Sequence, residues 1–256
     1  MTKSPLDRHR NVQMRAVEFQ GRFHDVLTRA AADARREPAR NELGPYITIS
    51  RQAATGGVEI AHMVAKRWGW SVLDKELVEG IAHHLELAPR MLELMDETRT
   101  DWFSESFLTL LEPRLLTQDS YVSMLCKIVL LAAYDGRVII VGRGAGLMLP
   151  REPGLAVRIV APRASRLARL CHQENLEPRA AGKRLDEIDA SRETFVRRHF
   201  HCDPEDPTCY DLVVDSDALG LEGAAEIICH AAELRGLTRS RPVRSSRAVP
   251  EPAPTP

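Results

Sequence analysis

Short apolar runs alternate with longer stretches of helical periodicity over most of the chain. Five runs have the length and composition of strands, and they cover Tyr46–Ser50, Trp70–Asp74, Val138–Val141, Ala156–Val160 and Leu212–Val214. Between these runs, apolar residues recur at intervals of three and four, which is typical of helices with one buried face. Strands that alternate with helices predict a mostly parallel sheet that is covered by helices on both faces.

Local signals mark where several of these helices begin and end. Apolar residues recur at helical spacing up to Trp68, and the next residue is Gly69, a residue type that often ends a helix. Pro162 follows the fourth strand, and proline is favoured at the start of a helix. A long helical block from Lys75 to Tyr134, interrupted by prolines, separates the second strand from the third.

The two ends of the chain differ from this pattern. Apolar side chains at helical spacing over residues 9–36 predict an amphipathic helix, and the segment from Pro38 to Pro45 then forms a hinge. Residues 237–256 combine arginine, serine and proline with few large apolar side chains, so we expect a disordered tail. The sequence therefore predicts a helical extension over 1–45, one folded domain over 46–236 and a flexible end.

Composition and charge restrict the class of protein. The 256 residues include 35 basic and 36 acidic side chains, and this net charge of −1 gives no strong signal for nucleic-acid binding. No apolar run approaches the roughly 20 residues that a membrane-spanning helix needs, and the polar start lacks a secretory signal. Five cysteines, an odd number, indicate reduced thiols. We expect a cytoplasmic protein without membrane contact.

The loop after the first strand is the first candidate site. Ligands of parallel sheets bind beyond the carboxyl ends of the strands, and a loop there can direct backbone N–H groups at a phosphate. In a Walker A loop, GxxxxGK[ST], the lysine and the hydroxyl contact phosphate and Mg²⁺. If the second glycine is Gly56, then Arg51 replaces the first glycine, Gly57 the lysine and Val58 the hydroxyl residue. Taken alone, the segment fits an ordinary turn better.

An ordered set of short motifs over residues 46–235 resembles the cytidylate kinase-like family, a divergent branch of the nucleoside monophosphate kinases. The motifs are Ser50-Arg51, Thr55-Gly56-Gly57, Ile60-Ala61, Asp74-Lys75-Glu76-Leu77, Gly142-Arg143-Gly144, Asp189-Ala-Ser-Arg192 and Tyr210-Asp-Leu-Val-Val-Asp215. The resemblance implies a P-loop nucleotide kinase-like α/β fold with a five-stranded parallel sheet in the order 2-3-1-4-5. It also implies a helical acceptor-side insertion over 75–135 and a lid over 163–205.

The same resemblance implies a reaction and a set of site residues. The reaction is transfer of the γ-phosphate of ATP to a nucleoside monophosphate-like acceptor, with Mg²⁺ carried by the nucleotide. The implied donor-binding residues are Ser50, Arg51, Thr55, Gly56 and Gly57, and the implied acceptor-binding residues are Asp74, Arg143, Asp189 and Arg192. Phosphoryl transfer depends on neutralising charge, so Arg51, Arg166 and Arg192 are the candidate catalytic residues. No metal ligand is assigned; Asp74 is a candidate whose alternative role is to stabilise a helix N-terminus.

The chain also departs from the family pattern. It lacks the Walker lysine and hydroxyl, and the Cβ atoms of Ala53 and Ala54 disfavour the left-handed backbone that a phosphate loop needs. An arginine expected four residues before Asp189 is Leu185. Two hypotheses remain open. Either Arg51 supplies the missing cation, or the protein is a degenerate, inactive nucleotide-binding or protein-interaction module.

Other patterns favour simpler interpretations. Gly142-x-Gly144-x-Gly146 resembles a dinucleotide-binding motif, but Leu147 and two nearby prolines argue against NAD. The spacing of His199, His201, Cys202 and Cys209 does not match a zinc site. Asp189 and Arg192 also fit an ion pair on a helix surface. A homodimer through the helical insertion or the N-terminal helix is a further expectation.

Overall fold

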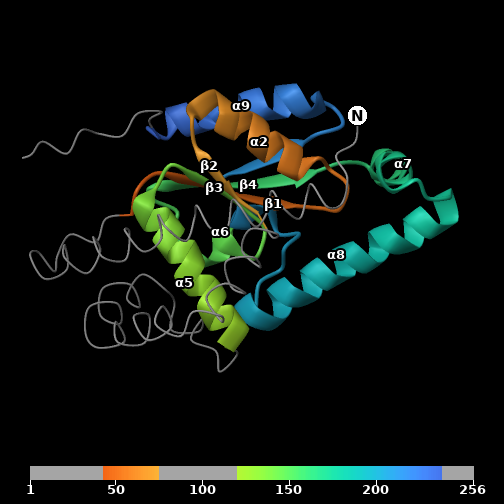
Figure 1. The fold of residues 1–256 in the computed structure, drawn as a ribbon, viewed down its shortest axis with the longest axis horizontal. Helices are drawn as coiled ribbons and strands as arrows, with labels where there is room; N and C mark the ends of the chain where they lie inside the picture. The colour runs from red at the N-terminus through yellow and green to blue at the C-terminus, as the bar shows by residue number, and fades with distance from the viewer. Residues whose placement is uncertain (1–42, 75–119, 238–256) are drawn as a thin grey trace, which may run out of the picture.

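A five-stranded parallel sheet forms the centre of the computed structural model, which describes residues 43–74 and 120–237 (Figure 1). Its strands are β1 Tyr46–Arg51, β2 Ser71–Leu73, β3 Val138–Val141, β4 Gly154–Val160 and β5 Leu212–Asp215. They lie in the order β2-β3-β1-β4-β5, which confirms the predicted order with the first strand in the middle. The predicted ends of β3 are identical to the observed ones, and those of the other strands differ by at most two residues.

Helices cover both faces of this sheet. The α-helices of the described ranges are α2 Gly57–Trp68, α5 Ser120–Asp135, α6 Ala145–Met148, α7 Arg163–Glu174, α8 Pro178–Phe200 and α9 Gly220–Leu234, and a short 3-10 helix covers Pro207–Cys209. In Figure 1, α2 and α9 lie on one face, and α5 and α6 lie on the other. Helices α7 and α8 pack against each other, and α8 extends away from the sheet (Figure 1).

Alternation along β1 explains this layered arrangement. Ile47 and Ile49 are almost fully buried and belong to the core shared with α2 and α9, whereas Tyr46 belongs to the core under α5. Because successive side chains of a strand point to opposite faces, Ser50 lies on the same face as Tyr46. In the register of β1 and β4, Ser50 pairs with Arg158, so both side chains face the side of α5 and α6.

The described residues cover only parts of the expected domain organisation. Residues 120–135 of the expected insertion form α5, a buried helix of the core, and the expected lid over 163–205 corresponds to α7, α8 and the turn that follows. The expected N-terminal helix, residues 75–119 and nearly all of the expected tail lie outside the described residues. Among the helices that the structure describes, none is long and apolar enough to cross a membrane.

Candidate functional site

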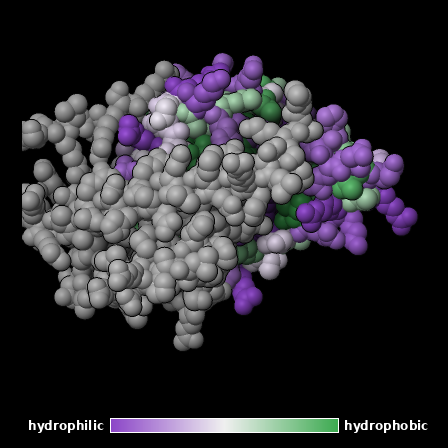
Figure 2. Space-filling model, in the orientation of Figure 1, coloured by the Kyte–Doolittle hydropathy of each residue, from purple (hydrophilic) through white to green (hydrophobic). Residues whose placement is uncertain are grey.

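A cavity of about 630 Å³ lies at the carboxyl ends of β1 and β3, where a parallel sheet is expected to bind its ligand. Its lining comes from the end of β1, the turn and short helix after β3, the middle of β4, one side of α8, and the segment before β5. Hydrophilic residues predominate on the visible surface of α7 and α8, beside this cavity (Figure 2).

The loop between β1 and α2 contains two residues with a left-handed backbone. Gly56 has φ 77° and directly precedes the first residue of α2, so the N-terminus of this helix opens at the loop. Ala54 has φ 57°, the left-handed conformation that its Cβ disfavours by about 1 kcal/mol. The loop therefore adopts a left-handed residue at Ala54 although the side chain disfavours it.

Arg166 and Asp189 bind each other and the loop. Arg166 is 8% exposed, and its Nε donates to the carbonyl of Ala161 at 3.1 Å. Its Nη1 donates to Asp189 Oδ2 at 2.5 Å and to the Ala53 carbonyl at 3.4 Å. The other oxygen of Asp189 accepts the Ala53 N–H at 2.7 Å. The structure thus places these two predicted site residues against the loop, with Asp189 at the edge of the cavity.

The side chain of Arg51 crosses the carboxyl ends of the strands, from the start of α2 to the turn after β3. A Cβ on Gly57 would lie 3.0 Å from Arg51 Cγ, and a Cβ on Gly142 would lie 1.9 Å from Arg51 Nη1. Burial lowers the pKa of Arg51, the charges of Arg192 and Arg143 lower it further, and Asp74 acts in the opposite direction. Its guanidinium therefore lies against Gly142, in the turn after β3.

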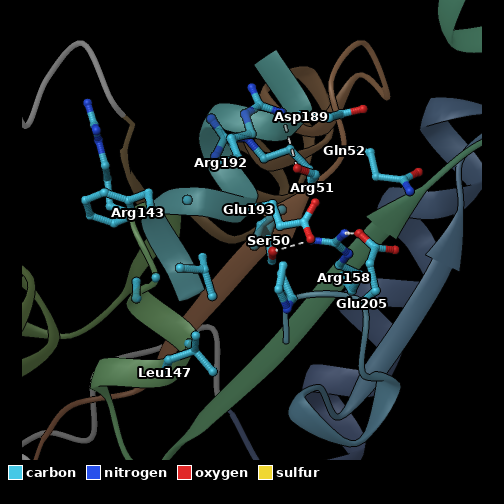
Figure 3. A pocket seen from close by; sticks show the side chains of 18 of the residues that line it. Ser50, Arg51, Gln52, Arg143, Leu147, Arg158, Asp189, Arg192, Glu193 and Glu205 are labelled. Atoms are coloured by element: carbon cyan, nitrogen blue, oxygen red, sulfur yellow. Dashed lines mark hydrogen bonds and ion pairs between the residues drawn. The ribbon is translucent and has the colours of Figure 1, made fainter. Parts of the chain in front are cut away.

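Arg143 and Arg192 line the same cavity, although they are distant in sequence. Arg192 extends from α8, and its Nη1 donates to the carbonyl of Arg51 at 3.2 Å (Figure 3). Burial lowers the pKa of Arg192, Asp189 raises it, and the positive charges of Arg158, Arg143 and Arg166 lower it further. Several arginine side chains therefore lie in or beside one partly buried cavity, and their positive charges favour binding of an anion there.

A second polar group in the cavity was not recognised from the sequence. Arg158 is 7% exposed, and its Nη1 donates to Ser50 Oγ at 2.9 Å (Figure 3). Its Nη2 forms an ion pair with Glu205, and its guanidinium lies over the ring of Tyr210, 5.7 Å from the centroid. The sequence did contain a signal for this group, because Arg158 lies inside the apolar run Ala156–Val160. A charged side chain in a buried strand needs polar partners nearby.

Of the other residues singled out in the sequence, Thr55 lies in the loop and Asp74 lies at the end of a strand. The Thr55 hydroxyl donates to the Gln52 carbonyl at 3.0 Å, and Asp74 is 8% exposed directly after β2. Cys209 lies near Asp203, and burial is the main cause that raises the pKa of its thiol. No group of three or more His, Cys, Asp or Glu side chains suited to a metal ion occurs within the described ranges.

The sheet order, the loop after the central strand and the helical pair beside it define the fold of the P-loop kinases. The model of the cytidylate kinase-like family matches residues 46–218, and the chain belongs to this family. This family and this fold are those of nucleotide kinase-type phosphotransferases.

Individual relatives resemble parts of the chain. A protein of Methanocaldococcus jannaschii named cytidylate kinase is 31% identical over 104 residues, which are 40% of this chain and 58% of that protein. The chain thus spans less than two thirds of the length of this curated relative. The crystal structure of an uncharacterized protein from Eubacterium ventriosum has a TM-score of 0.59 at 18% identity, covering 74% of this chain and 98% of that chain. This likeness shows the fold alone. A shikimate kinase from Bacteroides thetaiotaomicron has a TM-score of 0.41 at 16% identity, over 73% of this chain and 98% of that chain.

Proposed function

We propose that the protein transfers the terminal phosphoryl group of ATP to a nucleoside monophosphate-like acceptor. In this reaction a phosphate oxygen of the acceptor attacks the terminal phosphorus, the bond from that phosphorus to its bridging oxygen breaks, and a nucleoside diphosphate leaves. The observation that carries the proposal is that Arg51, Arg143 and Arg192 all line one cavity beside the loop after β1, where the charges of Arg143 and Arg192 act on Arg51. Such a transfer needs positioning and charge neutralisation more than covalent chemistry.

The loop fits the phosphates of the donor. Its backbone turns through Ala54 and Gly56 into the N-terminus of α2, and the buried Gly57 adds no side chain of its own at this helix end. Mg²⁺ bound to the donor offsets part of the phosphate charge when it is present. Asp74 is the proposed carboxylate on the protein side, because it is buried at the end of β2 and acts electrostatically on Arg51.

Arg51 is the proposed substitute for the missing lysine. Its stem passes over Gly57, the position that a Walker lysine would occupy, and a side chain there would crowd the Arg51 Cβ and Cγ. Its guanidinium lies against Gly142 in the turn after β3, which is the space toward which the transferred group points in this hypothesis. A guanidinium can also hold two phosphate oxygens at once.

For the acceptor phosphate, Arg143 and Arg192 are the proposed partners. We expect Arg143→Ala to weaken the binding of CMP about tenfold, since a charge-assisted hydrogen bond contributes roughly 1.5–3 kcal/mol. Calorimetric titration with CMP measures this change. The matched control is Arg163→Ala, because Arg163 is paired with Asp186 on the surface of α7. An unchanged CMP affinity in Arg143→Ala would make Arg143 a structural residue.

For the acceptor base, Arg158 and Glu205 are the proposed partners. Both oxygens of Asp189 already accept hydrogen bonds from Ala53 and Arg166, whereas Glu205 is 57% exposed at the cavity and pairs with Arg158. Together they offer N–H donors beside a carboxylate acceptor, which suits a base edge with a ring acceptor next to an amino group.

We therefore expect Glu205→Gln to lower the ratio of kcat/KM for CMP over UMP about tenfold, because an amide can donate to the uracil carbonyl. Competition assays with both monophosphates measure the ratio. Glu193→Gln is the control: it removes the same charge from the cavity lining, where Glu193 is bound to Arg197. A ratio that stays constant in Glu205→Gln, or falls equally in both variants, would exclude Glu205 from base recognition.

A coupled assay of ADP release with a panel of monophosphates, run beside measurements of ATP and GTP binding, tests the proposed function. Turnover with one or more monophosphates is the expected result. Binding without turnover would instead support the second hypothesis, an inactive nucleotide-binding module. That hypothesis is favoured by one observation, the glycine at position 57 in place of the lysine.

A further inference from the structure

Five consecutive carbonyl groups of the loop accept hydrogen bonds from side chains. The donors to the carbonyls of residues 51, 52, 53, 54 and 55 are, in order, Arg192, Thr55, Arg166, Arg169 and Ser216. Four of these five donors come from outside the loop. Arg166 and Arg169 belong to α7, Arg192 belongs to α8, and Ser216 follows β5. The loop is therefore bound on its outer side by three separate parts of the fold.

This arrangement determines where the N–H groups of the loop point. In a trans peptide, the carbonyl of one residue and the N–H of the next lie in one plane and point in opposite directions. When the carbonyls of Ala53, Ala54 and Thr55 are held toward α7 and Ser216, the N–H groups of residues 54, 55 and 56 point to the other side. Within the described ranges, none of these three N–H groups has an acceptor.

We propose that Arg166, Arg169 and Ser216 are positioning residues that hold the phosphate loop in its anion-binding conformation. The inference rests on the proposed function for the ligand, a nucleoside di- or triphosphate. We call these three residues the loop clasp. The clasp keeps Ala54 in the left-handed region at φ 57°, a conformation that the Cβ of an alanine disfavours.

Ser216 and Arg166 are buried behind the loop, so they can position the loop without contacting the ligand. Ser216 is 1% exposed, it carries no charge, and its Oγ donates to the Thr55 carbonyl at 2.8 Å from behind the loop. Arg166 is 8% exposed, and its Nε and Nη1 already donate hydrogen bonds to Ala161, Ala53 and Asp189. A ligand on the N–H side of the loop therefore reaches Ser216 only through the loop itself.

Ser216→Ala is the first test, because it removes a neutral hydroxyl that a nucleotide cannot touch. We expect affinity for ATP and for ADP to fall equally, by about fivefold, the value of one ordinary hydrogen bond. Ser216→Thr keeps the hydroxyl and is expected to retain most of the affinity. Equal affinity of Ser216→Ala and the wild type for both nucleotides would overturn the proposal.

Arg169→Gln is the second test, with Arg163→Gln as a matched control. Both arginines lie on α7, but Arg169 Nη1 donates to the Ala54 carbonyl at 3.2 Å, whereas Arg163 pairs with Asp186 on the surface. We expect Arg169→Gln to weaken ATP and ADP about equally, Arg169→Lys to recover part of the loss, and Arg163→Gln to have no effect. A loss for ATP without a loss for ADP would show a direct contact with the terminal phosphate and overturn the proposal.

Hydrogen exchange of the loop amides keeps the clasp testable even if the proposed function fails. Without nucleotide, we expect Ser216→Ala and Arg169→Gln to accelerate exchange in peptides that cover residues 52–58, and Arg163→Gln to leave it unchanged. Faster exchange in a protein that binds no nucleotide would support the clasp and contradict the proposed function. Unchanged exchange in both clasp variants would contradict the clasp, whatever the protein binds.

Discussion

Replacement of Arg51 by alanine is expected to lower kcat about a thousandfold while the protein stays folded. Removal of one preorganised group that stabilises transition-state charge costs roughly 10²–10³ in kcat, and arginines in phosphoryl transfer reach higher values. Arg51 meets this description because its stem passes the start of α2, its guanidinium lies at Gly142, and it replaces the missing lysine in our proposal. Single-turnover measurement of phosphoryl transfer at saturating ATP isolates the chemical step.

Arg51→Lys separates charge from geometry in the same assay. A lysine keeps the positive charge but cannot hold two phosphate oxygens in one plane, so we expect it to recover only a small part of the activity. The free energy of unfolding is the control. Because Arg192 and Arg143 repel Arg51, removal of its charge relieves repulsion, and we expect no loss of stability from the charge itself. Full kcat in Arg51→Ala would transfer the role to other arginines of the cavity.

The fold was predictable from the sequence because the strands are buried on both faces. Runs such as Val138–Val141 consist of β-branched residues alone, and all four residues of β3 are buried. Their ends were less predictable: the fourth strand begins at Gly154, two residues before the expected start, because its pairing with Tyr46 is a tertiary contact. The strand order followed from the resemblance to the family, and β1 does lie between β3 and β4.

The directions of the arginine side chains were not predictable. The sequence places Arg166 and Asp189 on separate helices, and only the packing of α7 on α8 brings their side chains to 2.5 Å. The path of Arg51 across the strand ends depends on the glycines at positions 57 and 142, which leave space for its stem and its guanidinium. Arg158 was missed because its partners, Glu205 and Tyr210, lie far away in the sequence and reach it through the segment before β5.

A second large effect is expected from Gly142→Ala, which changes no charge. The new Cβ would lie 1.9 Å from Arg51 Nη1, so the flexible end of Arg51 must leave its position. We expect kcat to fall nearly as far as in Arg51→Ala. The backbone of Gly142 has φ 82°, so the alanine also adds strain of about 1 kcal/mol. Gly69→Ala is the matched control, because Gly69 has φ 65° at the end of α2 and no atom within 4 Å of the added Cβ.

The double variant Arg51→Ala with Gly142→Ala makes this prediction decisive. If Gly142→Ala acts by displacing Arg51, the two substitutions remove the same interaction, and the double variant should be no slower than Arg51→Ala alone. Independent effects would instead multiply, and the double variant would then be far slower than either single one. Single-turnover rates of the four proteins, with the unfolding free energy of Gly69→Ala as the measure of strain, separate these cases. Wild-type kcat in Gly142→Ala, or multiplied losses in the double variant, would show that Arg51 does not act from the space above Gly142.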